Sequence, residues 1–276
     1  MRCAVRLKIA ALITSLLATP LAAGAAGGKC DRLIATGGAD NPPFLWRDPQ
    51  NPKRLIGANA DLLKRIADSL ELKLELLYTG DSAKAVEEVS SGRVDLLADA
   101  ALSVSELERM DFVHPAITGL QVAAWVRNEP GVFYASRDDL AGQTGTRVAG
   151  QNWGRVFEGY AAEALKLDTA PSLAEAMQRL LVGETDYVLH ERYSAVALAG
   201  PLGLLDDVQR LQPPVLSRGM HLAVSHDSAC NSPWLRGQLA VKMTELRAAG
   251  VPEQLLADNL DRWKQQQLAP ASNSQR

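Results

Sequence analysis

The stretch Gly92-Arg-Val-Asp95, followed by the apolar run Leu96-Leu97-Ala98, decides the fold class of this chain. A helical pattern that begins at residue 82 leads into it, so the order is helix, glycine stop and buried strand. The same order returns in the second half, where Gly183-Glu-Thr-Asp186 precedes Tyr187-Val188-Leu189. This repeated order predicts two similarly built α/β units with a parallel strand in each half. The order is common in α/β proteins, so we infer no duplication from it.

The residues before this stretch predict a further strand, helix and strand. Leu33-Ile-Ala-Thr-Gly-Gly38 is a short apolar run that ends in glycines, and a turn-rich stretch around Asn41-Pro-Pro-Phe44 follows it. Residues 59–70 carry apolar side chains at helical spacing, and residues 72–78 alternate apolar and polar side chains.

Two apolar runs are candidate crossings between two lobes of the fold. Residues 120–127 and 219–225 are strand-like, and each begins or ends the α/β pattern of one half. We therefore predict a first lobe of residues 31–124 plus 222–266 and a second lobe of residues 125–221.

The C-terminal part of the chain predicts two helices and a tail. Residues 232–249 and 252–266 look helical, with Pro233 and Pro252 near their starts. Residues 267–276 have nothing to bury, so we expect a disordered tail there.

Composition bounds the function without deciding it. The chain has 276 residues, 47% of them apolar and 22% charged, which is a globular profile with room for two modest domains. Its 29 basic residues face 32 acidic ones, for a formal charge of −3. An acidic balance argues against nucleic acid or an anionic membrane as the main partner.

The first 26 residues predict an export signal. Arg2, Arg6 and Lys8 supply a positive start, Ile9 to Leu17 form an apolar run, and residues 21–26 form a small-residue cleavage region. The apolar run is too short to span a membrane. We therefore expect residues 1–26 to be a signal peptide and the mature chain to be periplasmic.

Export changes what the cysteines imply, because thiols can be oxidised outside the cytosol. Cys30 and Cys230 remain after the signal peptide is removed, an even count that is compatible with one disulfide. A zinc site of His221, His226 and Cys230 is the alternative, but an odd spacing on a strand sends the two histidines to opposite faces. We favour the disulfide.

Strong catalytic motifs are absent from the sequence. There is no Gly-x-Ser-x-Gly elbow, no phosphate-binding Gly-x-x-x-x-Gly-Lys loop and no His-Glu-x-x-His pair. The four histidines show no useful metal-ligand spacing. We expect no metal and no cofactor, and an enzyme is the less favoured interpretation.

Several motifs, in this order and spacing, resemble the bacterial extracellular solute-binding proteins of family 3, the periplasmic components of polar amino acid importers. The motifs are Asn41-Pro-Pro-Phe44, Leu55-Ile-Gly57-Ala-Asn59-Ala-Asp61-Leu62, Gly92-Arg-Val-Asp95, Glu108-Arg-Met-Asp-Phe112, His114-Pro115, Val148-Ala-Gly-Gln151 and Gly183-Glu-Thr-Asp186. The resemblance covers most of residues 31–266. It implies the two-lobed α/β fold of type II periplasmic binding proteins, with two hinge crossings and a ligand in the cleft.

Ligands of open α/β sheets sit beyond the carboxyl ends of parallel strands, where helix N-termini leave free N–H groups. The predicted strand ends lie near residues 38–41 and 98–103 in one lobe and near residues 150–154 and 190–192 in the other. Trp153 could stack on a ligand or lie in the interior. The candidate ligand-binding residues are Asn41, Asp99, Ala100, Ser103, Glu106, Asn152, Trp153 and Glu191.

The resemblance also implies departures from the family pattern at two positions and a match at a third. Asn41 stands where the family has an aromatic ring, and Glu106 where it has the arginine that grips the ligand carboxylate. Glu191 keeps the acidic residue that receives the ligand amine. If Asp99 joins these two carboxylates in the cleft, the site favours an amine-bearing solute over a free α-amino acid.

The resulting hypothesis is a periplasmic protein that captures a small polar, amine-bearing solute for an ABC importer, without catalysis and as a monomer. Arg155 or Arg192 restores an anion site if either points into the cleft. One alternative is a dehydratase-like enzyme on the same scaffold, but Ser194 stands nearest to that group's catalytic glutamate. Another is a ligand-sensing protein for a membrane receptor, which the sequence does not separate from transport.

Overall fold

The computed structural model describes residues 30–269. The predicted signal peptide and residues 270–276 lie outside the described residues. Helix α8, Val251–Leu268, runs two residues past the predicted end at 266, so residues 267 and 268 are helical and the expectation of a tail beginning at 267 is wrong. The physical reason is that the first strong helix stop after Trp263 in the sequence is Pro270. No helix within the described range is long and apolar enough to cross a membrane.

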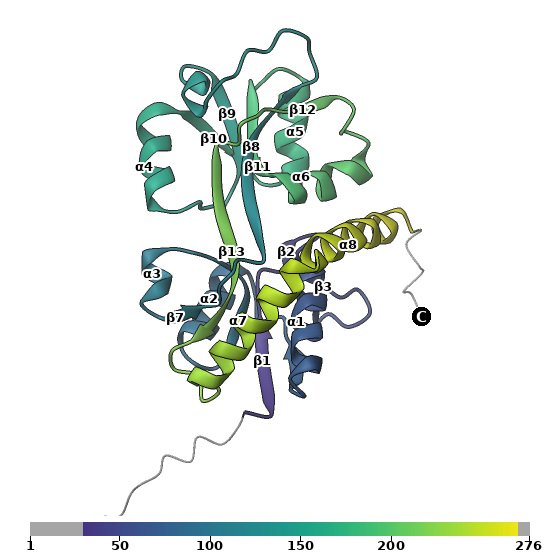
Figure 1. The fold of residues 1–276 in the computed structure, drawn as a ribbon. Helices are drawn as coiled ribbons and strands as arrows, with labels where there is room; N and C mark the ends of the chain where they lie inside the picture. Colours follow the sequence, from purple (N-terminus) through teal and green to yellow (C-terminus); the bar gives the residue numbers. More distant parts are fainter. Residues whose placement is uncertain (1–29, 270–276) are drawn as a thin grey trace, which may run out of the picture.

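The molecule has two α/β lobes joined by two long strands (Figure 1). Lobe 1 contains β1 Arg32–Thr36, β2 Asp40–Asn41, β3 Leu45–Arg47, β4 Leu55–Ile56, α1 Ala58–Ser69, β5 Lys73–Leu76, α2 Ser82–Ser90, β6 Leu96–Ala101, α3 Val104–Leu107, β7 Met110–Phe112, α7 Pro233–Ala248 and α8. Lobe 2 contains η1 Arg137–Leu140, β9 Thr144–Val148, α4 Arg155–Ala164, β10 Lys166–Ala170, α5 Leu173–Leu181, β11 Tyr187–Glu191, α6 Arg192–Ala199, η2 Gly200–Leu202 and β12 Val208–Arg210.

One sheet runs through both lobes in the order β10-β9-β11-β8-β13-β6-β1-β5. Strand β1 is parallel to both β5 and β6, and β9 is parallel to both β10 and β11. The predicted parallel strand in each half is therefore confirmed, and the α/β class follows from it.

The two crossings are β8, Thr118–Arg127, and β13, Leu216–Ser225. They pair with each other in antiparallel fashion between residues 118–122 and 216–220. Beyond that pairing β8 joins β11 of lobe 2, whereas β13 joins β6 of lobe 1. The paired crossing strands thus connect the sheet of one lobe to the sheet of the other.

The repeated sequence order forms the same local structure in each lobe: a helix end followed by the start of a strand. Gly92 and Gly183 have positive φ values of 71° and 79° just after α2 and α5, the backbone conformation that commonly ends a helix. Asp95 then accepts the Ile34 N–H at 2.8 Å, and Asp186 accepts the Thr144 N–H at 2.7 Å. Both aspartates therefore fix the start of a strand to its parallel neighbour.

Lobe 1 has a large apolar core and a smaller one that includes Ala85, Val89 and Leu97, and lobe 2 has a core on each face of its sheet. A disulfide joins Cys30 to Cys230, with 5.2 Å between their Cα atoms, which confirms the predicted pairing. It ties the residue before β1 to the segment after β13, so both of its ends belong to lobe 1.

Candidate functional site

A cleft of about 1040 Å³ lies between the lobes, on the side where α3 faces α4 (Figure 1). It is lined by Ala101, Leu102, Ser103, Val104, Ser105, Glu106, Glu108, Arg137, Asn152, Trp153, Gly154, Arg155, Val156, Phe157, Glu158, Leu216 and Arg218. Both lobes and the crossing strand β13 contribute to it. The volume is large enough for a small-molecule ligand.

Ser103 and Glu106 form the lobe 1 wall of this cleft. Ser103 caps α3 by accepting the Glu106 N–H at 3.3 Å, and its hydroxyl donates to Glu106 Oε2 at 3.1 Å. Burial raises the pKa of the Glu106 carboxyl, while the Ser103 hydrogen bond and the nearby Arg218 charge lower it. Glu106 is therefore a partly desolvated acidic group at the cleft.

Arg218 lines the same cleft from β13, and sequence reasoning missed it. Its Nε is buried without a hydrogen-bond partner among the described residues. Burial lowers the pKa of the guanidinium, and the opposite charge of Glu106 partly offsets that effect. The available signal was a lone cation within an otherwise uncharged crossing strand. The predicted crossing began at residue 219, one residue too late to include it.

Asn152 and Trp153 form the loop that enters α4 on the lobe 2 wall. Asn152 Oδ1 accepts the Gly154 N–H at 2.8 Å, and no side chain caps the helix. Trp153 is only 7% exposed and packs edge-to-face on Phe157, with ring centroids 5.4 Å apart. The indole therefore belongs to the lobe 2 core as well as to the cleft wall.

Asp99 and Ala100 lie near the end of β6 but do not line this cleft. Asp99 accepts the Gly38 N–H at 3.0 Å, and burial raises the pKa of its carboxyl to about 6. Ala100 is 1% exposed and pairs with His221 on β13. The structure thus places both residues in the packing of lobe 1.

Asn41 and Glu191 come together on the other side of the crossing strands, through Ser194. The Ser194 hydroxyl of α6 donates to Asn41 Oδ1 in lobe 1 at 2.6 Å. The Ser194 N–H donates to Glu191 Oε2 at 2.8 Å, and burial raises the pKa of the Glu191 carboxyl. Glu191 Oε1 is buried without a hydrogen-bond partner in the described part of the chain.

Further contacts tie the lobes together on this α6–α8 side. The Trp263 indole of α8 donates to the Ala197 carbonyl of α6 at 2.7 Å. Tyr193 packs against the lobe 1 core, and its ring lies edge-on to Phe44 with centroids 6.0 Å apart. Figure 1 shows α8 rising from lobe 1 toward α6.

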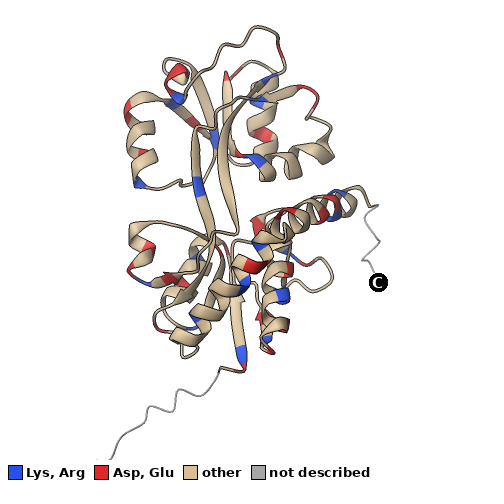
Figure 2. Cartoon of the chain, viewed as in Figure 1, with Lys and Arg blue, Asp and Glu red and all other residues tan. Residues whose placement is uncertain are grey.

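The two arginines considered from sequence lie in different places. Arg155, the first residue of α4, lines the cleft. The Arg192 guanidinium stacks over Tyr193, with Cζ 4.0 Å from the ring centroid, and does not line the cleft. Acidic and basic residues are interspersed over both lobes in the view of Figure 2.

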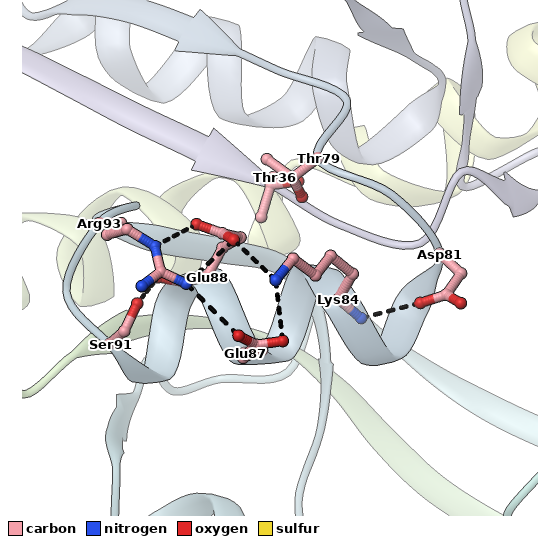
Figure 3. Close-up of polar contacts among 8 residues, drawn as sticks. All are labelled: Thr36, Thr79, Asp81, Lys84, Glu87, Glu88, Ser91 and Arg93. Atoms are coloured by element: carbon pink, nitrogen blue, oxygen red, sulfur yellow. Dashed lines mark hydrogen bonds and ion pairs between the residues drawn. The ribbon is translucent and has the colours of Figure 1, made fainter.

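A charged cluster on α2, outside the cleft, shows what paired charges look like in this molecule (Figure 3). Lys84 Nζ lies 2.9 Å from Glu87 and 3.3 Å from Glu88, and Arg93 Nε donates to Glu88 at 2.6 Å. Hydrogen bonding from Arg93 lowers the pKa of Glu88 to about 2. These charged groups satisfy one another, whereas the buried Arg218 Nε in the cleft has no hydrogen-bond partner among the described residues.

Solved structures with the same architecture show that the chain has the two-lobed fold of type II periplasmic binding proteins. A mutant of ArgBP from T. maritima has a TM-score of 0.61 at 19% identity, covering 84% of this chain and 96% of that one. AbpA from Streptococcus pneumoniae, an amino acid ABC transporter substrate-binding protein bound to L-arginine, has a TM-score of 0.64 at 19% identity with the same coverage. A histidine kinase sensor domain has a TM-score of 0.63 at 20% identity, covering 83% of this chain and 96% of that one.

The chain belongs to the bacterial extracellular solute-binding proteins, family 3, whose family model matches residues 33–261. A comparison with curated protein sequences gives no significant match. The likeness to the solved structures, at about a fifth identity, establishes the fold and not the solute.

Proposed function

We propose that this protein captures a small polar, amine-bearing solute in the α3–α4 cleft and delivers it to a membrane importer. The observation that carries the proposal is the opposed pair of charges in one interlobe cleft, Glu106 from α3 and Arg218 from β13. The family supports a solute-binding role. AbpA, an amino acid ABC transporter substrate-binding protein bound to L-arginine, and an ancestral arginine-binding protein bound to arginine support this class of solute and partner.

The cation at Arg218 modifies the solute expected from sequence. Glu106 stands where the family has an arginine that binds the ligand carboxylate. From sequence we therefore expected a solute that has an amine but no carboxylate. Arg218 provides a guanidinium from another element, and guanidinium groups bind carboxylates with two parallel hydrogen bonds. A solute with an amine near Glu106 and an acidic group near Arg218 therefore satisfies both side chains.

The proposed cycle uses the lobes predicted from sequence, residues 31–124 plus 222–266 and residues 125–221. A solute that contacts both lobes binds the closed form more tightly and shifts the population toward it. The periplasm is the proposed location, because the predicted signal peptide and the Cys30–Cys230 disulfide both suit an oxidising compartment.

The partner could be a sensor rather than an importer, and the likeness to a histidine kinase sensor domain supports that variant. The dehydratase alternative has less support. The Ser194 hydroxyl stands near the place of that group's catalytic glutamate, and here it donates its hydrogen bond to Asn41 across the lobes.

The proposal is tested by identifying the solute. Purified protein is denatured, and the small molecules it releases are identified by mass spectrometry. We expect an amine-bearing compound that rebinds the refolded protein, is recovered unchanged, and reduces the radius of gyration. Steady conversion of that compound at catalytic protein concentrations would establish the enzyme alternative, and failure of every released compound to rebind would reject the proposal.

A further inference from the structure

Apolar side chains from both lobes stand exposed at the mouth of the cleft. Val104 of α3 is 71% exposed, and Leu102 just before it is 41% exposed. Val156 of α4, on the opposite lobe, is 86% exposed. All three line the cleft that contains Glu106 and Arg218.

Packing does not account for these exposed side chains. Helix α3 buries none of its residues, and α4 buries Phe157 and Ala161 while Val156 stays in solvent. Single exposed apolar residues are ordinary on a protein surface. Three that converge from two lobes on one cavity point instead to an apolar partner.

The floor of the cleft continues the apolar surface. Leu216 of β13, Trp153 and Phe157 line it beside the charged groups. Trp153 and Phe157 are 7% and 2% exposed, so they form a fixed wall rather than mobile side chains. Charged side chains, Glu106 and Arg218 among them, and apolar side chains therefore line the same cleft.

We propose that the solute has an apolar body attached to its charged head: a small zwitterion or amine bearing an aromatic or branched aliphatic group. This inference rests on the proposed function and narrows it. In this arrangement the charged head of the solute lies between Glu106 and Arg218. Its apolar body lies between Val104 of α3 and Val156 of α4. Lobe closure then removes Val104 and Val156 from water together with the solute, which favours the closed form.

Matched solutes test the apolar body by isothermal titration calorimetry. L-phenylalanine and L-alanine share one zwitterionic head, and phenethylamine and ethylamine share one amine head. Within at least one pair we expect the larger compound to bind about tenfold more tightly or better, because even one methylene in an apolar pocket changes affinity by about that factor. Equal affinity within both pairs, or tighter binding of the smaller compounds, overturns the inference.

Substitutions of Val104 and Val156 show whether these two side chains themselves contact the apolar body of the solute. In the Val104→Ser and Val156→Ser double variant we expect the preference for the larger compound to fall at least about threefold, because the apolar body of that compound loses its contacts with both valines. Phe133→Ser is the matched control, since Phe133 is 80% exposed and is not among the residues that line the cleft. It should leave both affinities unchanged.

The remaining outcomes also decide. An unchanged preference in the double variant overturns the inference. Binding of the small compounds alone overturns the inference but leaves the proposed function intact. If no compound of either pair binds, the solute released from the denatured protein decides: an apolar group in it supports the inference, and a wholly polar solute overturns it. A protein that neither releases nor binds any solute fails both proposals.

Discussion

The two sides of the interlobe junction are built differently. On the α3–α4 side the walls enclose an open cleft, and the buried Arg218 Nε has no partner among the described residues. On the α6–α8 side the lobes touch, through the Ser194–Asn41 and Trp263–Ala197 hydrogen bonds. Both sides contain polar groups, but the Ser194–Asn41 and Trp263–Ala197 hydrogen bonds both lie on the α6–α8 side.

This difference indicates how the lobes move. Contacts that already span the α6–α8 side act as a fixed edge, whereas an open cleft separates α3 from α4. We therefore expect closure to bring α3 toward α4 while the α6–α8 contacts persist. In the proposed function, the solute supplies interactions between α3 and α4 that favour the closed form.

Removing the disulfide should have the largest effect on stability. It should not change the difference between the α3–α4 side and the α6–α8 side of the junction. Cys230→Ser removes the disulfide between two cysteines that are 200 residues apart in the sequence. Loop-closure entropy predicts a loss on the order of 3–5 kcal/mol in the free energy of unfolding. Urea denaturation measures this loss. The Cys30→Ser and Cys230→Ser double variant should match the single one, and a single variant as stable as the parent protein would argue against the bond.

Tyr193→Ala should weaken the contacts between the lobes on the α6–α8 side. It removes a ring that packs on Phe44 and the lobe 1 core, so we expect a loss of about 2–3 kcal/mol and a larger radius of gyration. Denaturation and small-angle scattering measure the two effects. Tyr193→Phe keeps the ring and should show neither effect; a Tyr193→Ala protein of unchanged size would remove Tyr193 from the fixed edge.

Arg218→Gln should weaken the open side without loosening the fold. Solute affinity should fall by about 1.5–3 kcal/mol, the worth of a hydrogen bond to a charged group, while thermal stability stays the same or rises. Arg155→Gln is the control, because Arg155 lines the cleft but is solvent-exposed, and it should cost less. Equal losses in the two variants would mean that Arg218 has no special role.

Trp263→Phe should remove one interlobe hydrogen bond, worth about 1 kcal/mol. Trp46→Phe is the matched control, since the Trp46 indole donates at 2.9 Å to Gln266 within lobe 1. Both variants should lose similar stability, but only Trp263→Phe should increase the distance between α6 and α8. The same distance change in both would show that the bond to Ala197 does not hold the lobes.

Two buried groups, one in each lobe, should give opposite pH dependence. The pKa of Asp99 is raised to about 6 and that of His190 is lowered to about 4, in both cases chiefly by burial. Between about pH 4 and 6 the folded state binds the extra proton at Asp99, whereas the unfolded state binds it at His190. The Asp99 contribution to stability thus falls as pH rises through this window, and the His190 contribution rises.

Stability curves of two variants separate these contributions. Relative to the parent protein, Asp99→Asn should make the free energy of unfolding rise more steeply between about pH 4 and 6. His190→Asn should make it rise less steeply, or fall, over the same window. Slopes that stay unchanged in both variants would contradict the assigned directions.

The sequence predicts features that depend on local order. The glycine stops at Gly92 and Gly183 and the strands after them follow from spacing alone, because helix ends and buried strands leave periodic patterns. The Cys30–Cys230 pair followed from the predicted export and the even count of cysteines left after it. The extent of α8 was underestimated because residues 267 and 268 carry no apolar pattern.

The site depends on tertiary geometry that no local pattern records. Arg218 shares a cleft with Glu106 only because β13 crosses between the lobes beside α3 and α4. The contact from Trp263 to Ala197 joins residues 66 positions apart. Asp99, predicted at the ligand, accepts the Gly38 N–H in lobe 1 and is not among the residues that line the α3–α4 cleft. Each of these positions depends on how elements that are distant in the sequence pack together. A local sequence pattern does not contain that information.

Paired spin labels test the central claim, that the open side closes on solute while the tied side stays fixed. One pair replaces the exposed Ser105 of α3 and Glu163 of α4, and the other replaces the exposed Leu202 of η2 and Lys264 of α8. Distances are measured by pulsed electron spin resonance with and without the tightest-binding solute. We expect the first distance to shorten and the second to stay the same; a first distance that does not shorten, or a second that changes as much as the first, would contradict the account.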